Sequence, residues 1–129
     1  MRPVIVCLCG STKFREEYRR ENARLTMNGC IVLSVGCFQG DPEWGTNKVN
    51  LDKLHLAKIA MSDSVFVINK DGYIGESTKN EIAYARTLKI PITYMEPIHE
   101  LSREEFVKKY VQPAWEQHVK NTPEGGSFL

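Results

Sequence analysis

The segment from Gly75 to Glu81 places a glycine, hydroxyl side chains and two carboxylates at the predicted start of a helix. From the first turn of that helix, Glu81 would point toward a ligand-binding crevice, where a carboxylate can act as a nucleophile. The competing interpretation is a capping box, in which Glu81 reaches back to the backbone N–H of Thr78 and has only a structural role. Glu76 can assist as an acid or orient Glu81, but an exposed loop carboxylate fits the pattern equally well. The local pattern leaves these alternatives open.

A second segment with a glycine and hydroxyl side chains, formed by Gly10, Ser11 and Thr12, lies between a predicted strand and a predicted helix. Free backbone N–H groups and the helix dipole at such a turn favour a phosphate or another anion. Lys13 and Arg15 can add positive charge. Ser and Thr are also common helix N-caps, and the turn matches neither the Walker loop nor the GxGxxG fingerprint. An anion site and a plain cap therefore both remain open.

The stretch 36–47 contains three glycines and a proline and is too long for an ordinary connection. Such a stretch indicates a binding loop. It carries two aromatic residues, Phe38 and Trp44.

The four cysteines do not form CxxC pairs. Cys7 and Cys9 have the spacing of residues that share one face of a strand rather than the spacing of zinc ligands. We expect Cys7, Cys9, Cys30 and Cys37 to be free thiols, buried or half-buried, with a disulfide or a metal site as the minor alternative. No metal and no other cofactor is expected.

The elements that position these residues alternate between strand and helix. Hydrophobic periodicity predicts strands over 4–8, 30–35, 64–69 and 92–95, and helices over 14–27, 51–61, 78–88 and 102–118. A βαβαβαβα order is typical of right-handed βαβ units. We therefore predict an α/β three-layer sandwich, flavodoxin- or Rossmann-like, with a mostly parallel sheet of four to five strands. Ligands bind such sheets at the carboxyl ends of the strands, where the three loops described above converge.

The composition sets limits on the class of protein. A chain of 129 residues with 42% hydrophobic residues suits one compact domain, and we place this domain at 1–120, followed by a flexible tail or oligomer arm at 121–129. The net charge of +1 argues against a nucleic-acid partner. No apolar run approaches the roughly 20 residues of a membrane helix, and the start of the chain lacks a secretory-signal pattern. We expect a cytoplasmic protein without a membrane partner.

Several segments together resemble the nucleoside 2-deoxyribosyltransferase superfamily, which includes deoxynucleoside 5′-monophosphate N-glycosidases and phage-type relatives. These segments are CGST at 9–12, the pair Ser62 and Asp63 before VFVIN, GYIGEST at 72–78 and NEIAYARTLKIPITYME at 80–96. The similarity covers 4–96. Its most specific part is the pattern of Glu, Ile, a small residue, Tyr and Ala that follows the Gly and Ser/Thr loop.

The resemblance implies that Glu81 attacks C1′ of the sugar and forms a glycosyl-enzyme intermediate, with hydrolysis by water or transfer to a base as the second step. It places the turn Gly10–Thr12 against the sugar or the 5′-phosphate. It also places Gly75, Ser77 and Thr78 near the sugar or its phosphate. Trp44 and Phe38 can then stack on the base, although a lid or a subunit contact explains a loop aromatic equally well. A homodimer or higher homo-oligomer is implied as well, often with a neighbouring subunit that completes the pocket.

The chain departs from the family pattern about eight residues before Asp63, where the family carries an Asp that helps to handle the leaving base. His55 occupies this register, and Asp52 lies one helical turn earlier. A histidine can donate a proton near neutral pH, but a lone His on an apolar helix is also a common packed residue. The Tyr that deoxyribosyltransferases carry after the first strand is missing.

We expect cleavage or transfer at an N-glycosidic bond of a nucleoside or nucleotide. The alternative is a non-catalytic protein that sequesters or senses a nucleotide or an ADP-ribose-like signalling molecule.

Overall fold

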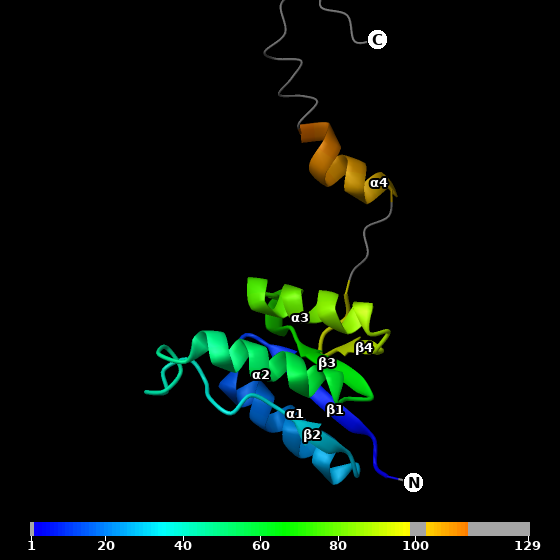
Figure 1. Ribbon diagram of the computed structural model, residues 1–129. Coiled ribbons are helices and arrows are strands. Elements are labelled where there is room, and N and C mark those ends of the chain that lie inside the picture. The colour runs from blue at the N-terminus through cyan, green and yellow to red at the C-terminus, as the bar shows by residue number, and fades with distance from the viewer. Residues whose placement is uncertain (1, 99–102, 114–129) are drawn as a thin grey trace, which may run out of the picture. The chain divides into compact units, whose positions relative to one another are not determined.

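The computed structural model describes residues 2–98 and 103–113, and the chain divides into two units, Met1–Ile98 and His99–Leu129. The first unit is an α/β sandwich around a four-stranded, all-parallel sheet (Figure 1). Its strands are β1 (Ile5–Gly10), β2 (Ile31–Leu33), β3 (Ser64–Ile68) and β4 (Ile92–Tyr94), and its helices are α1 (Arg15–Met27), α2 (Lys48–Ala60), the 3-10 turn η1 (Lys70–Gly72) and α3 (Glu76–Thr87). The structure confirms the predicted fold class.

The described part of the second unit consists of α4 (Arg103–Phe106) and a π-helical segment, η2 (Val107–Val111). The predicted helix over 102–118 falls partly on these residues. The predicted tail at 121–129 lies outside the described residues. None of the helices in the described ranges is long and apolar enough to cross a membrane.

Side chains of β1 alternate between two cores and so define the three layers. Cys7 and Cys9 pack with Ile59 of α2 and with α3 on one face of the sheet. Leu8 packs with Tyr18 of α1 on the other face. The alternation follows from the pleat of a strand, in which successive side chains point to opposite faces. Figure 1 shows α2 and α3 side by side, in agreement with their contacts.

The strand order β2-β1-β3-β4 places the crevice of the sheet at the carboxyl ends of β1 and β3. The chain leaves these two neighbouring strands in opposite directions, and this topological switch point is where open parallel sheets bind ligands. The last residue pair of the two strands is Gly10 opposite Ile68. The carbonyl of Gly10 accepts a 2.8 Å hydrogen bond from the hydroxyl of the buried Tyr18, which holds the end of β1 against α1.

Arg2 and Asp63 connect the start of the chain to the residue before β3. The Arg2 guanidinium donates to both carboxylate oxygens of Asp63 at 2.5 and 2.8 Å, and the backbone N–H of Ile5 donates to the same carboxylate at 2.8 Å. Hydrogen bonds from Arg2 and Ile5 lower the pKa of Asp63 from 3.8 to about 2. Asp63 therefore anchors the start of β3 to the N-terminal segment.

Replacing Asp63 with asparagine is expected to lower the free energy of unfolding at neutral pH, because the charged partner of Arg2 is lost. The pKa of Asp63 is lower in the folded state than in the unfolded state. Its carboxylate therefore stabilises the folded protein fully above pH 3.8, and this stabilisation disappears as the pH falls through about 2. Urea unfolding at a series of pH values measures this. The difference between wild type and Asp63→Asn should shrink from pH 5 to pH 2, and a constant difference would contradict the assignment.

Candidate functional site

A cavity of about 330 Å³ opens at the carboxyl ends of β1 and β3. This volume lies at the lower end of the range for small-molecule pockets. Ten of the residues predicted for the site line this one cavity, namely Gly10, Ser11, Thr12, Trp44, His55, Gly75, Glu76, Ser77, Thr78 and Glu81. The parallel sheet thus brings the three predicted loops together.

Helix α3 begins earlier than predicted, and this changes the interpretation of Glu81. Glu76 is the first helical residue and Gly75 is the N-cap, without a side-chain capping hydrogen bond. Thr78 lies inside the first turn and is almost fully buried, so it cannot be the N-cap of a capping box with Glu81. The capping-box interpretation is wrong. Glu81 lies in the second turn of α3, not the first, and faces the cavity.

The Glu81 carboxyl group is buried beside His55 of α2. The side chain of Glu81 is 14% exposed, and its Oε2 atom has no hydrogen-bond partner among the described residues. Burial raises the pKa of Glu81 to about 7, while the positive charge of a protonated His55 acts in the opposite direction. Perturbed carboxyl groups of this kind are enriched at functional sites. The carboxyl group of Glu81 can therefore gain or lose a proton near neutral pH.

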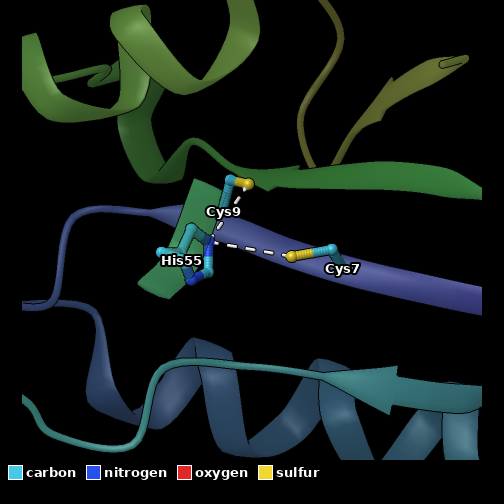
Figure 2. A group of neighbouring side chains, drawn as sticks. All are labelled: Cys7, Cys9 and His55. Atoms are coloured by element: carbon cyan, nitrogen blue, oxygen red, sulfur yellow. Dashed lines mark hydrogen bonds between the residues drawn. The ribbon is translucent and has the colours of Figure 1, made fainter. Parts of the chain in front are cut away.

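His55 joins Glu81 to the strand below it. Its Nε2 atom lies 3.7 Å from Cys7 Sγ and 3.4 Å from Cys9 Sγ (Figure 2). The same atom lies 3.6 Å from Glu81 Oε2. Burial lowers the pKa of His55, but the hydrogen bond with Cys7 and the charges of Cys7 and Glu81 outweigh it, so the pKa is raised. The ring is thus both packed against the sheet and part of the cavity wall, which combines the two interpretations of this histidine.

The thiols beside His55 are a feature that sequence reasoning did not connect to the site. All four cysteines are free, and Cys7 and Cys9 are fully buried on one face of β1, as expected. The hydrogen bond with Cys9 lowers the pKa of Cys7 to about 5, with a further contribution from His55, whereas the pKa of Cys9 is raised. The spacing of two residues predicts that the thiols share a face. No local signal indicates that a helix about fifty residues later places an imidazole over them.

The turn at Gly10, Ser11 and Thr12 is not a helix cap. Helix α1 begins at Arg15, and its N-cap, Phe14, makes no side-chain capping bond. The Ser11 hydroxyl instead accepts a 3.3 Å hydrogen bond from the backbone N–H of Lys13 within the turn. The plain capping interpretation is therefore wrong, and the turn is available to line the cavity.

The two cations that follow this turn are engaged elsewhere. The Lys13 ammonium group lies 3.6 Å from the centroid of the Tyr73 ring, and Arg15 forms an ion pair with Asp41 at 2.6 Å. Neither lines the cavity.

The two aromatic residues of the long loop have separate positions. Trp44 lines the cavity. Phe38 instead packs edge-to-face on Tyr18 of α1, with ring centroids 5.4 Å apart, and belongs to the core. The structure therefore removes Phe38 from the residues that can stack on a base.

Two lysines of the cavity wall, Lys48 and Lys58, were missed by sequence reasoning. Lys58 donates a 2.6 Å hydrogen bond to the Ser34 carbonyl, whereas Lys48 lies among candidate site residues. The Lys48 ammonium group lies 3.1 Å from a carboxylate oxygen of Asp52 and donates a 3.2 Å hydrogen bond to the Ser77 hydroxyl. It also lies 5.8 Å from the ring centroid of Trp44. The sequence feature that could have indicated Lys48 is its spacing of four residues from Asp52, which places the two side chains one helical turn apart. This spacing was overlooked because α2 begins at Lys48, three residues before the predicted start.

Glu76 lies at the mouth of the cavity. Its side chain is 86% exposed and forms an ion pair with Lys79 at 3.2 Å. This position favours the exposed-carboxylate alternative for Glu76 over a direct role in proton transfer.

The fold and the cavity define a class, that of parallel α/β proteins with a small-molecule pocket at the carboxyl ends of the central strands and a carboxyl–imidazole pair in its wall. Comparison with models of protein families finds no match, and comparison with curated proteins finds none either.

Proposed function

We propose that this protein cleaves or transfers the N-glycosidic bond of a nucleoside or nucleotide, with Glu81 as the nucleophile. The observation that carries the proposal is the buried Glu81 carboxyl group, which faces the cavity 3.6 Å from the imidazole of His55. Two titratable groups in contact can hold one proton between them. Its transfer to His55 would create a nucleophile and an acid in one step.

The reaction that suits this pair has two steps. Glu81 attacks C1′ of the sugar as the bond between C1′ and the base nitrogen breaks, and the bonding electrons leave with the base. His55 gives its proton to that nitrogen. A water molecule, or the ring nitrogen of a second base, then attacks C1′ of the glycosyl ester as the bond to Glu81 breaks, and the proton that the acceptor loses returns to His55. Asp52 lines the same cavity and is the second candidate for handling the base.

The groups available for a sugar phosphate lie on two sides of the cavity. The N-terminus of α3, with Gly75 as its N-cap, and the turn at Gly10–Thr12 supply backbone N–H groups. Lys48 adds a positive charge beside Ser77. These features support a substrate with a 5′-phosphate, held by local dipoles and the positive charge of Lys48.

The direct test is incubation of the protein with a panel of deoxyribo- and ribonucleotides, followed by chromatography and mass spectrometry. Release of free base together with the sugar phosphate supports hydrolysis. Exchange of a labelled base into the nucleotide supports transfer. If every nucleotide is recovered intact over long incubation, the proposal fails.

Trp44→Ala is expected to weaken nucleotide binding about tenfold, the order of magnitude of one lost base–aromatic stack. Trp44→Phe should keep most of the affinity, because a smaller ring still offers an aromatic face. Calorimetry or KM measurements on both variants check this. Equal losses in both, or none in Trp44→Ala, would show that Trp44 does not stack on the base.

The second candidate function is a protein that binds a nucleotide without turning it over. The burial of His55 against Cys7 and Cys9 favours it, because these contacts hold the imidazole at the floor of the cavity. Heating a saturated complex separates the two functions. Intact ligand supports sequestration or sensing, whereas free base excludes it.

We also propose a homo-oligomer. Helix α2 carries exposed apolar side chains at Val49 and Leu54, and Met61, the C-cap of this helix, is exposed as well. Leu54 also lines the cavity. Burial of such side chains against a second copy would stabilise an assembly and enclose the cavity further. Sedimentation velocity at several concentrations measures the subunit number.

A further inference from the structure

We propose that Cys7, Cys9 and His55 form a binding site for a soft divalent metal ion of the Zn²⁺ type, with Glu81 beside its fourth position. The three side chains come from β1 and α2 and point toward one another beneath the cavity (Figure 2). Thiolate and imidazole are the ligands that Zn²⁺ prefers in proteins. This inference reverses the expectation that no metal binds.

The distances between the ligand atoms suit a tetrahedral ion. With Zn–S bonds of about 2.3 Å and Zn–N bonds of about 2.0–2.1 Å, tetrahedral angles place sulfur and nitrogen roughly 3.5 Å apart. The observed distances from His55 Nε2 are 3.4 Å to Cys9 Sγ and 3.7 Å to Cys7 Sγ. All three ligand atoms lie within 4.8 Å of one another. Side-chain adjustments of a few tenths of an ångström can therefore admit an ion.

The supporting elements hold these side chains in place before an ion binds. Cys7 and Cys9 lie on β1, which pairs with β2 on one side and β3 on the other, and both cysteines are fully buried. His55 is only 6% exposed. Little conformational freedom remains to be lost when the metal binds, which favours affinity.

A buried carboxyl oxygen without a partner lies next to the same site. Glu81 Oε2 lies 3.6 Å from His55 Nε2 and has no hydrogen-bond partner among the described residues, but it is not one of the three ligand atoms that lie within 4.8 Å of one another. The fourth position is therefore left to a water molecule or another ligand beside Glu81. His55 Nδ1 has no partner within the described residues, so no hydrogen bond fixes the tautomer of the ring. The ring can carry its proton on Nδ1 and present the lone pair of Nε2 to the ion.

A bound ion would occupy the two groups that the proposed reaction needs. Coordination removes the lone pair of His55 Nε2 and attracts the carboxylate of Glu81, so metal binding and base release exclude each other. This consequence rests on the proposed function, whereas the metal site itself does not.

The test is a titration of the reduced, full-length protein with Co²⁺, followed by displacement with Zn²⁺. We expect one ion per chain, a thiolate-to-cobalt charge-transfer band and the strong visible bands of tetrahedral cobalt, all of which Zn²⁺ removes. Cys9→Ser and His55→Gln each remove a metal ligand and should weaken binding at least about 100-fold. Loss of a residue that only hydrogen-bonds to a metal ligand already weakens metal binding by up to about 100-fold. Cys30→Ser is the matched control and should bind like wild type, because Cys30 is not part of the cluster.

The wild-type spectrum decides the proposal even where a variant fails to fold, as circular dichroism would show. Absence of a charge-transfer band at saturating Co²⁺ overturns the site, as does a band that survives in both folded variants. Base release measured with and without Zn²⁺ then tests separately whether metal binding prevents the reaction. A cobalt spectrum without inhibition would retain the metal site and reject the role of Glu81 and His55 in the reaction.

Discussion

Glu81→Gln is expected to reduce release of free base from a nucleotide by at least about 1,000-fold, because the amide keeps the shape of the side chain but cannot form the glycosyl ester. Single-turnover assays with excess enzyme measure the effect on the chemical step. Glu16→Gln is the matched control, since Glu16 lies on the exposed surface of α1 and pairs with Arg19 away from the cavity. Its activity should equal that of wild type.

The Glu81 variant should also remain folded. Burial disfavours the charged form of this carboxyl group, so the neutral amide removes a desolvation cost rather than a stabilising ion pair. The free energy of unfolding is therefore expected to stay the same or to rise. Full activity in a folded Glu81→Gln protein would exclude Glu81 as the nucleophile, and loss of activity together with loss of folded structure would show that its role is structural.

Gly10→Ala is expected to lower the free energy of unfolding by about 2 kcal/mol or more, because two costs combine at this position. The φ angle of Gly10 is +149°, a conformation that other residues rarely adopt. A Cβ atom at Gly10 would also lie 2.6 Å from the carbonyl oxygen of Ile68, a backbone atom of the paired strand that cannot rotate away. Urea unfolding of wild type and variant measures the difference.

Gly29→Ala separates the two costs. Gly29 also has a positive φ, +86°, but a Cβ atom there would meet nothing within 4 Å. Its substitution should therefore cost only the backbone strain, about 1 kcal/mol. If both variants lose the same stability, close approach of β1 and β3 does not require a glycine at position 10.

The order of elements could be predicted from local patterns because each pattern has a local physical cause. Continuous apolar runs at Val65–Ile68 and at the N-terminal strand are typical of strands covered on both faces. Helical periodicity likewise located α1 to within one residue of its observed start. The boundaries near the cavity were less accurate. Helix α2 begins three residues before its predicted start, and helix α3 begins two residues before its predicted start. Lys48 and Glu76, the first residues of these helices, are polar and therefore do not contribute to hydrophobic periodicity.

Roles that depend on the direction of a side chain could not be predicted in this way. The spacing of Thr78 and Glu81 fits a capping box as well as a site residue, and the pattern cannot show that the helix begins at Glu76, which excludes the capping box. The loop position of Phe38 fits a base-stacking role equally well. Only its contact with Tyr18 assigns it to the core.

The sequence by itself determined a parallel α/β fold and the three loops that line one cavity, because periodicity and chain order govern which ends of the strands meet. The tertiary structure decided which groups touch. It placed His55 between Glu81 on one side and the thiols of Cys7 and Cys9 on the other, three segments that are far apart in the chain. Contacts of this kind depend on how the helices pack across the sheet, and no local pattern of residues records that packing.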